Sequence, residues 1–95
     1  MIPYETHEVN KALENLQGWS YDGASKSINK KYTFEDFNEA FGFMSRIAMY
    51  AESKGHHPEW FNVYNRVEVV LSTHDALGVT QKDIDMARFM DQVVQ

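Results

Sequence analysis

Three histidines are the residues of this chain best suited to chemistry. His56 and His57 are adjacent, and His74 follows them further along the chain. Imidazole has an unperturbed pKa of about 6.5, so near neutral pH it can both donate and accept a proton. Positioned proton transfer typically accelerates a reaction about 10²–10⁴-fold. If the fold brings the three rings to one cleft, they can divide the work of an acid and a base without a cofactor.

Two alternatives to a catalytic role stay open for these histidines. Adjacent histidines arise by chance in surface loops, and a single histidine near a helix end is more often solvated than catalytic; we interpret His7 in that way. Zinc binding is the second alternative, because imidazole is a common zinc ligand. Neighbouring side chains in an extended chain point apart, however, and Pro58 biases His57 towards extended dihedrals. Because no His-x-x-x-His or Glu-x-x-His spacing is present either, we expect no metal site.

The composition restricts the classes of protein to consider. The 95 residues suffice for one domain, which we place over residues 1–95, and 43% of them are apolar. The chain has no cysteine, which excludes disulfides and thiolate chemistry. Its formal charge is −5, so direct binding to nucleic acid or to an anionic membrane is disfavoured. The N-terminus has neither a basic start nor an apolar run, and we expect a cytoplasmic protein.

The N-terminal third of the chain predicts a short helix followed by a β-hairpin. After Thr6, apolar side chains recur at helical spacing, and Gly18 ends the pattern. The dipeptide Asp22-Gly23 is typical of a two-residue hairpin turn, because its residues tolerate positive φ. The return strand is expected over residues 24–32.

The clearest predicted element is a long helix that ends before Gly55, a natural C-terminal breaker. Thr33 and Asp36 have the spacing of a capping box at its start. Steps of three and four direct one apolar face towards the sheet, and this face holds Phe34, Phe37, Phe41, Met44, Ile47, Ala48 and Ala51. The histidine pair is therefore expected directly after this helix.

Two further strands and a last helix complete the predicted chain. Residues 60–64 and 66–72 are rich in aromatic and β-branched side chains and predict strands. The final helix opens at Thr80, and Asp83 lies where a carboxylate favours the positive end of the helix dipole. The predicted order is α-β-β-α-β-β-α, an α+β fold. His74 follows the fourth strand, whose end can lie beside the end of the long helix.

The last helix also predicts self-association. Its apolar side chains cover more than half of its circumference, at Ile84, Met86, Ala87, Phe89, Met90, Val93 and Val94. One sheet should not bury so wide an arc. We therefore expect a homo-oligomer, a dimer or a tetramer, with this helix in the contact.

The histidines belong to a run that resembles a known enzyme family. Residues 52–64 read Glu-Ser-Lys-Gly-His-His-Pro-Glu-Trp-Phe-Asn-Val-Tyr, and Leu71-Ser-Thr-His74 and Asp83 follow. This pattern closely resembles pterin-4a-carbinolamine dehydratase, and the similarity extends upstream to Trp19 and downstream to the final helix. The resemblance implies a four-stranded antiparallel sheet with three helices packed on one face. It also implies dimers that pair into tetramers through a terminal helix.

The same resemblance implies the reaction. Members of the family remove water from a 4a-hydroxytetrahydropterin, the product of aromatic amino acid hydroxylases, and give the quinonoid dihydropterin. An acid protonates the departing hydroxyl while a base takes the proton from N5. The resemblance assigns these two roles to His56 and His74, with His57 assisting. It implies no cofactor, and the activity would support the recycling of tetrahydrobiopterin.

Further site residues follow from the resemblance. The substrate-binding residues that it implies are Glu52, Trp19, Ser72, Thr73 and Asp75, with Trp19 closing the pocket, while Asp83 and Pro58 support the site. Gly55 departs from the relatives, which often carry Asp or Asn there, so any contact from that side chain is lost. Animal relatives also stabilise dimers of a homeodomain transcription factor, which leaves a protein-binding role and a nuclear location open. The apolar final helix is the expected docking surface for such a partner.

Overall fold

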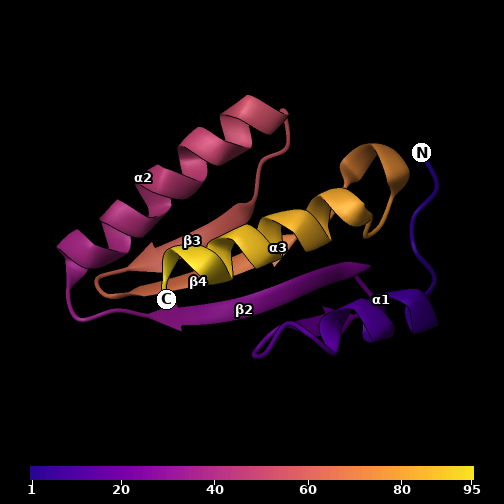
Figure 1. Ribbon diagram of the computed structural model, residues 1–95, viewed down its shortest axis with the longest axis horizontal. Coiled ribbons are helices and arrows are strands. Elements are labelled where there is room, and N and C mark those ends of the chain that lie inside the picture. The colour runs from indigo at the N-terminus through magenta and orange to yellow at the C-terminus, as the bar shows by residue number, and fades with distance from the viewer.

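The chain folds into one four-stranded antiparallel sheet with three helices packed on one face (Figure 1). The computed structural model describes residues 1–95. Its elements, in chain order, are α1 (Thr6–Leu13), β1 (Ser20–Asp22), β2 (Ser27–Thr33), α2 (Phe37–Lys54), β3 (Glu59–Val63), β4 (Arg66–Leu71), the short 3-10 helix η1 (His74–Ala76) and α3 (Gln81–Val93). The strand order is β1-β2-β4-β3. The predicted α+β fold and the predicted order of helices and strands are confirmed.

The core lies between the sheet and the helices. Alternate side chains of β4 point to it, so that Val67, Val69 and Leu71 are buried while their neighbours are not. The buried face continues onto β2, because Ile28 of β2 pairs with Leu71 and Tyr32 pairs with Val67. In Figure 1, α3 runs across the sheet with α2 on one side and α1 on the other. None of these helices combines the length and the apolar character needed to cross a bilayer.

The N-terminal hairpin differs from the predicted two-residue turn. Asp22 pairs with Ser27, so the loop holds the four residues between them. The carboxylate of Asp22 accepts from the backbone N–H groups of Ala24 and Ser25, and Lys26 adopts a φ of 54°. The hydrogen bonds from Ser25 lower the pKa of Asp22. The side chain of Asp22 thus builds a wider turn than the Asp-Gly pair alone predicts.

The start of α2 was predicted incorrectly, and its buried face was predicted in part: Ile47 and Ala51 are buried as expected. Thr33 remains in β2, and Asp36 caps the helix by accepting from the N–H of Glu39 at 2.8 Å. The buried row of α2 consists of Ala40, Phe43, Ile47 and Ala51. Phe37 and Phe41 lie beside this row and are 45% and 55% exposed. Because helical periodicity admits several overlapping apolar rows, the pattern alone did not select the row that faces the sheet.

Most of the apolar arc of α3 is buried within the chain itself. Ile84, Met86, Ala87 and Met90 are each at most 1% exposed, because α3 lies between the sheet, α2 and α1 rather than on the sheet alone. The argument that this arc requires a second subunit was therefore wrong. Phe89 and Val93 are only partly buried and Val94 is 42% exposed, so the C-terminal end of α3 is the part of this helix that still offers apolar surface to a protein partner. Self-association itself stays a prediction.

Candidate active site

The histidine pair is positioned by the C-terminal end of α2. Gly55 ends the helix in the left-handed region at φ 61°, a conformation that glycine adopts at little cost. The backbone N–H of His56 donates to the carbonyl of Ala51 at 3.1 Å and closes the turn. Pro58 then leads into β3. The direction of both imidazoles is thus set by a helix cap and a proline.

The end of β4 brings His74 to the same place. Thr73 forms an isolated bridge with Gly78 just after the strand, and His74 opens η1. A hollow of about 220 Å³ lies where these segments meet the first turn of α3. Its lining residues are Gly55, His56, His57, Ser72, Thr73, His74, Asp75 and Lys82. All three histidines therefore share one cleft, together with three of the residues implied to bind substrate.

The three imidazoles differ in their access to water. His56 is 9% exposed. In contrast, 61% of the His57 side chain and 75% of the His74 side chain are exposed. A buried ring is held by its neighbours, while an exposed ring exchanges protons with solvent. The cleft thus combines one imidazole that is held in place with two that can exchange protons with water.

His56 is held by a buried carboxylate. Its Nε2 lies 2.6 Å from Oδ1 of Asp83, which is fully buried. Asp83 is the third residue of α3, at the positive end of the helix dipole as the sequence predicts, and it forms a capping box with Thr80. The capping position therefore has a second effect, because the carboxylate that caps α3 also contacts the histidine that follows α2. A buried hydrogen bond to a charged group is worth about 1.5–3 kcal/mol.

The other two histidines have carboxylate partners at the surface. Nε2 of His57 lies 2.9 Å from Glu52, and Nε2 of His74 lies 3.6 Å from Glu59. Exposed pairs of this kind contribute about 0–1 kcal/mol. Glu52 does not line the cleft itself and reaches it only through His57. Glu59 was not singled out from the sequence, although its place directly after Pro58 puts it at the start of β3, next to the end of β4.

Lys82 and Gly55 also line the cleft without having been predicted as site residues. The signal for Lys82 was present, because the capping box that fixes Asp83 also places Lys82 in the first turn of α3. No cluster of three or more His, Cys, Asp or Glu side chains has an arrangement that could hold a metal ion.

Trp19 is not brought to the cleft. Its indole is buried in the core and packs edge-on against Tyr32. The indole N–H donates to both carboxylate oxygens of Asp91, at 3.2 and 3.3 Å, and Tyr32 donates to Asp91 at 2.5 Å. Burial, aided by the hydrogen bond to Asp91, raises the pKa of Tyr32 far above its ordinary value. Within one chain Trp19 therefore joins β2 to the end of α3 and contacts none of the histidines.

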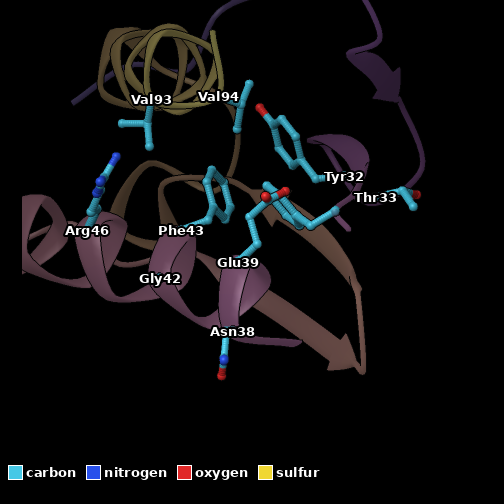
Figure 2. Close-up of a pocket in the computed structure, with 10 residues that line it drawn as sticks. Tyr32, Thr33, Asn38, Glu39, Gly42, Phe43, Arg46, Val93 and Val94 are labelled. Atoms are coloured by element: carbon cyan, nitrogen blue, oxygen red, sulfur yellow. The ribbon is translucent and has the colours of Figure 1, made fainter. Parts of the chain in front are cut away.

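A larger hollow lies elsewhere in the molecule. It has a volume of about 660 Å³ and is lined by residues of β2, the first half of α2 and the end of α3. Figure 2 shows Val93 and Val94 on one side of it and Phe43, Glu39 and Arg46 on the side of α2. No histidine reaches it, and the hydroxyl of Tyr32 is already bound to Asp91. We therefore place the candidate active site in the smaller histidine cleft.

Known proteins are similar to this chain over most of its length. The model of the family described as "Pterin 4 alpha carbinolamine dehydratase" matches residues 2–93. A protein from Burkholderia orbicola, provisionally named pterin-4-alpha-carbinolamine dehydratase, is 53% identical over 92 residues, which are 96% of this chain and 90% of the relative. One of the same provisional name from Bradyrhizobium sp. is 57% identical over 82 residues, 86% of this chain and 82% of the relative.

The fold is also found in a solved structure. The crystal structure of a transcriptional coactivator/pterin dehydratase from Brucella melitensis matches with a TM-score of 0.95 and 47% sequence identity, over 98% of this chain and 99% of that chain. The match of sequence and fold over nearly all residues confirms the resemblance that the histidine run carries. The chain belongs to the pterin 4 alpha carbinolamine dehydratase family.

Proposed function

We propose that this chain removes water from a 4a-hydroxytetrahydropterin by histidine acid–base catalysis, as a hydro-lyase. Family membership supports the class of reaction. The observation that supports the mechanism is the convergence of His56, His57 and His74 on one hollow, although His74 lies on a different element from the other two. The product would be the quinonoid dihydropterin, which returns to the tetrahydropterin used by aromatic amino acid hydroxylases.

The reaction needs two proton transfers and no oxidant. The bond from C4a to the hydroxyl oxygen breaks, and the oxygen leaves as water after it takes a proton from an acid. The proton on N5 passes to a base, and the electron pair of that N–H bond forms the double bond between N5 and C4a. We assign these roles to His56 and His74, one on each side of a flat ring, with the division between acid and base left open.

The different exposures of the imidazoles suit this cycle. After each turnover the base has gained a proton and the acid has lost one. His74 is open to solvent and can exchange its proton with water, whereas His56 is held in place by Asp83. His57, paired with Glu52, would hold the substrate and assist, and Ser72 and Asp75 offer hydrogen bonds at the wall of the cleft.

Substitution of the histidines tests this proposal. His74→Ala should lower the rate of carbinolamine loss about 10²-fold, because one positioned proton transfer is lost. The measurement is stopped-flow absorbance of freshly generated 4a-hydroxypterin, with His56→Ala and His57→Ala in parallel. Circular dichroism should show an unchanged fold for His74→Ala, since that side chain is exposed.

His7→Ala is the matched control, because the His7 side chain is 79% exposed on α1, with Nδ1 3.9 Å from Glu5. It should react at the wild-type rate. If His74→Ala and His56→Ala both do so as well, histidine catalysis in this cleft is excluded.

A second candidate function is the stabilisation of a transcription factor dimer. The similar protein from Brucella melitensis is described as a transcriptional coactivator as well as a dehydratase. The partner would be a homeodomain-type transcription factor, and contact would be made through protein rather than DNA. The exposed Phe37 and Phe41 of α2, whose ring centroids are 5.7 Å apart, offer one pair of aromatic side chains for it.

Substitutions can separate dehydration from the stabilisation of a transcription factor dimer. Sedimentation of a purified homeodomain factor, with and without this chain, measures whether its dimer is stabilised. The His74→Ala variant should still stabilise the dimer of the factor but should lose catalysis. The Phe41→Ser variant should keep catalysis but should no longer stabilise that dimer. No change in the sedimentation of the factor with the wild-type chain would exclude the coactivator role for that factor.

A further inference from the structure

We propose that Thr73 is a positioning residue: its hydroxyl, backed by that of Thr80, fixes the carboxylate of Asp83 and so holds His56 in the tautomer that carries its proton on Nε2. This inference deepens the proposed function, and only its kinetic consequence rests on that function. The tautomer is a property of the folded protein that can be measured without substrate.

Asp83 lies at the centre of a closed polar cluster in the core. The carboxylate is fully buried, and Thr73, Thr80 and His56 are each at most 9% exposed. Oδ2 accepts from the hydroxyl of Thr73 at 2.8 Å and from the backbone N–H of Thr80 at 2.9 Å. Oδ1 lies 2.6 Å from Nε2 of His56. Every polar side-chain atom buried here has a partner, and such satisfied networks favour one arrangement.

Counting protons gives the direction of every bond in the cluster. Each hydroxyl has one proton to donate. Thr80 Oγ1 accepts from the backbone N–H of Lys82, and it lies 2.7 Å from Thr73 Oγ1. Because the proton of Thr73 is donated to Asp83, the proton of Thr80 must be donated to Thr73. Both hydroxyls therefore point their protons towards the carboxylate.

The same count fixes the tautomer of His56. Oδ2 accepts from two donors and so carries no proton. A carboxyl group is ordinarily a stronger acid than an imidazolium, so the proton shared between Oδ1 and Nε2 belongs on the nitrogen and Asp83 is the ionised acceptor. Nε2 of His56 must then be the donor in the short contact to Oδ1. Nδ1 is left as the ring nitrogen that is free of this network and available to substrate in the cleft.

The position of Thr73 makes it suited to this task. Its backbone N–H donates to the carbonyl of Gly78 at 2.8 Å, and this bridge joins the end of β4 to the approach to α3. Thr73 lines the cleft, but its hydroxyl is committed to Asp83. We therefore assign Thr73 to positioning rather than to binding substrate.

The test compares two substitutions that differ by one hydroxyl. Thr73→Val removes the donor at similar volume, while Thr73→Ser restores it. Long-range proton–nitrogen NMR spectra of the ¹⁵N-labelled protein, recorded where the rings are neutral, identify which nitrogen of His56 is protonated. Wild type and Thr73→Ser should show a single form with the proton on Nε2. Thr73→Val should show a mixture of tautomers and faster exchange of this proton with water.

Kinetics give the second measurement. Turnover of 4a-hydroxypterin should fall about tenfold in Thr73→Val, the size of one hydrogen bond to a charged group, with KM changed less than turnover. Thr73→Ser should restore it. Thr33→Val, at an exposed threonine of β2 outside the histidine cleft, is the matched control and should leave both measurements at their wild-type values.

Three results would overturn the inference. The first is a wild-type His56 protonated on Nδ1, a measurement that needs no variant to fold. The second is a single Nε2 tautomer in folded Thr73→Val, and the third is full turnover in that variant. If the tautomers behave as expected but the wild type has no dehydratase activity, the proposed function fails and the positioning by Thr73 stands.

Discussion

The imidazoles of the cleft are distinguished by the carboxylates beside them. Asp83, the partner of His56, is fully buried, whereas the Glu52 and Glu59 side chains that pair with His57 and His74 are 84% and 63% exposed. Salt screens exposed charges over a length of about 10 Å at 0.1 M and about 3 Å at 1 M, while buried pairs are screened much less. The orientation of His56 should therefore persist at high ionic strength, when the two surface pairs loosen.

Asp83→Asn should reverse the tautomer of His56. The donors from Thr73 and Thr80 keep the amide oxygen on their side, which turns the amide NH₂ towards Nε2 of His56. That nitrogen must then accept, and the proton moves to Nδ1. A histidine in the wrong tautomer is a poor catalyst, and we expect turnover to fall at least about 10²-fold. Steady-state rates and the NMR tautomer assay measure both effects.

The turnover of Asp83→Asn separates the two roles of Asp83, as the cap of α3 and as the partner of His56. An asparagine caps helices about as well as an aspartate, so the stability of α3 should change little through capping. Wild-type turnover in Asp83→Asn would mean that Asp83 serves only as the cap of α3.

The junction between α2 and the histidine pair depends on the backbone of Gly55. An added Cβ would meet no atom within 4 Å, but the φ of 61° disfavours any side chain. Gly55→Ala should lower the free energy of unfolding by about 1 kcal/mol. Gly55→Asn should cost less, because asparagine tolerates the left-handed region. Urea unfolding followed by circular dichroism measures the difference.

Gly42 offers a matched control for Gly55. It lies inside α2, and an added Cβ there also meets nothing within 4 Å. Gly42→Ala should raise the free energy of unfolding by about 0.8–1 kcal/mol, because alanine is the better helix former. Equal effects of the two substitutions would contradict the role assigned to the left-handed cap.

Tyr32 links β2 to the end of α3 and should make stability fall at alkaline pH. Its pKa is raised in the folded state, so the folded chain keeps a proton that the unfolded chain loses. The stabilisation is complete below the ordinary tyrosine pKa of about 10 and declines as the pH rises above it. Tyr32→Phe should lower the free energy of unfolding by about 1–2 kcal/mol at neutral pH. It should also remove the part of the alkaline fall in stability that comes from Tyr32.

The control for this prediction is Tyr64→Phe, since Tyr64 is 61% exposed. It should leave the alkaline decline unchanged. Urea unfolding between pH 7 and about 11 distinguishes the two variants. If the stability of Tyr32→Phe falls at alkaline pH as much as that of the wild type, then groups other than Tyr32 cause the fall.

The sequence predicts the elements of this fold better than it predicts their contacts. Strand alternation and the place of Asp83 in the first turn of the last helix are local patterns, and both appear as expected. The buried row of α2 and the burial of α3 depend on which helix lies beside which, and no local pattern contains that information. The order of helices and strands indicated that the three histidines could meet, and the resemblance implied their roles, whereas the contact of Asp83 with His56 requires two helix ends to meet in space.

Trp19 illustrates the same limit. Resemblance implies that it closes the substrate pocket, yet in this chain its indole bonds Asp91 within the core. The partner carboxylate is separated from it by 72 residues, so no spacing rule could indicate the contact. Long-range polar contacts of this kind follow only from the packed structure.

The distribution of exposed apolar side chains over the molecule bears on its assembly. Because α3 is largely covered within the chain, most of the apolar surface left for a second copy is elsewhere. Phe37, Phe41 and Met49 of α2 are exposed, and Phe61 and Val63 are exposed on β3, an edge strand of the sheet. A chain of 95 residues has a thin margin of stability, and shared burial of such side chains would widen it.

We expect the wild-type chain to form a dimer or a tetramer in solution, with the exposed face of α2 in the contact. Phe41→Glu should shift it to smaller species, because a buried glutamate without a partner opposes association. Phe61→Glu, on the open face of the sheet, is the comparison at an equally exposed phenylalanine. Sedimentation velocity measures the size of each. A wild type that sediments as the 11.1 kDa monomer would contradict self-association, and dissociation by Phe61→Glu alone would move the contact from α2 to the sheet.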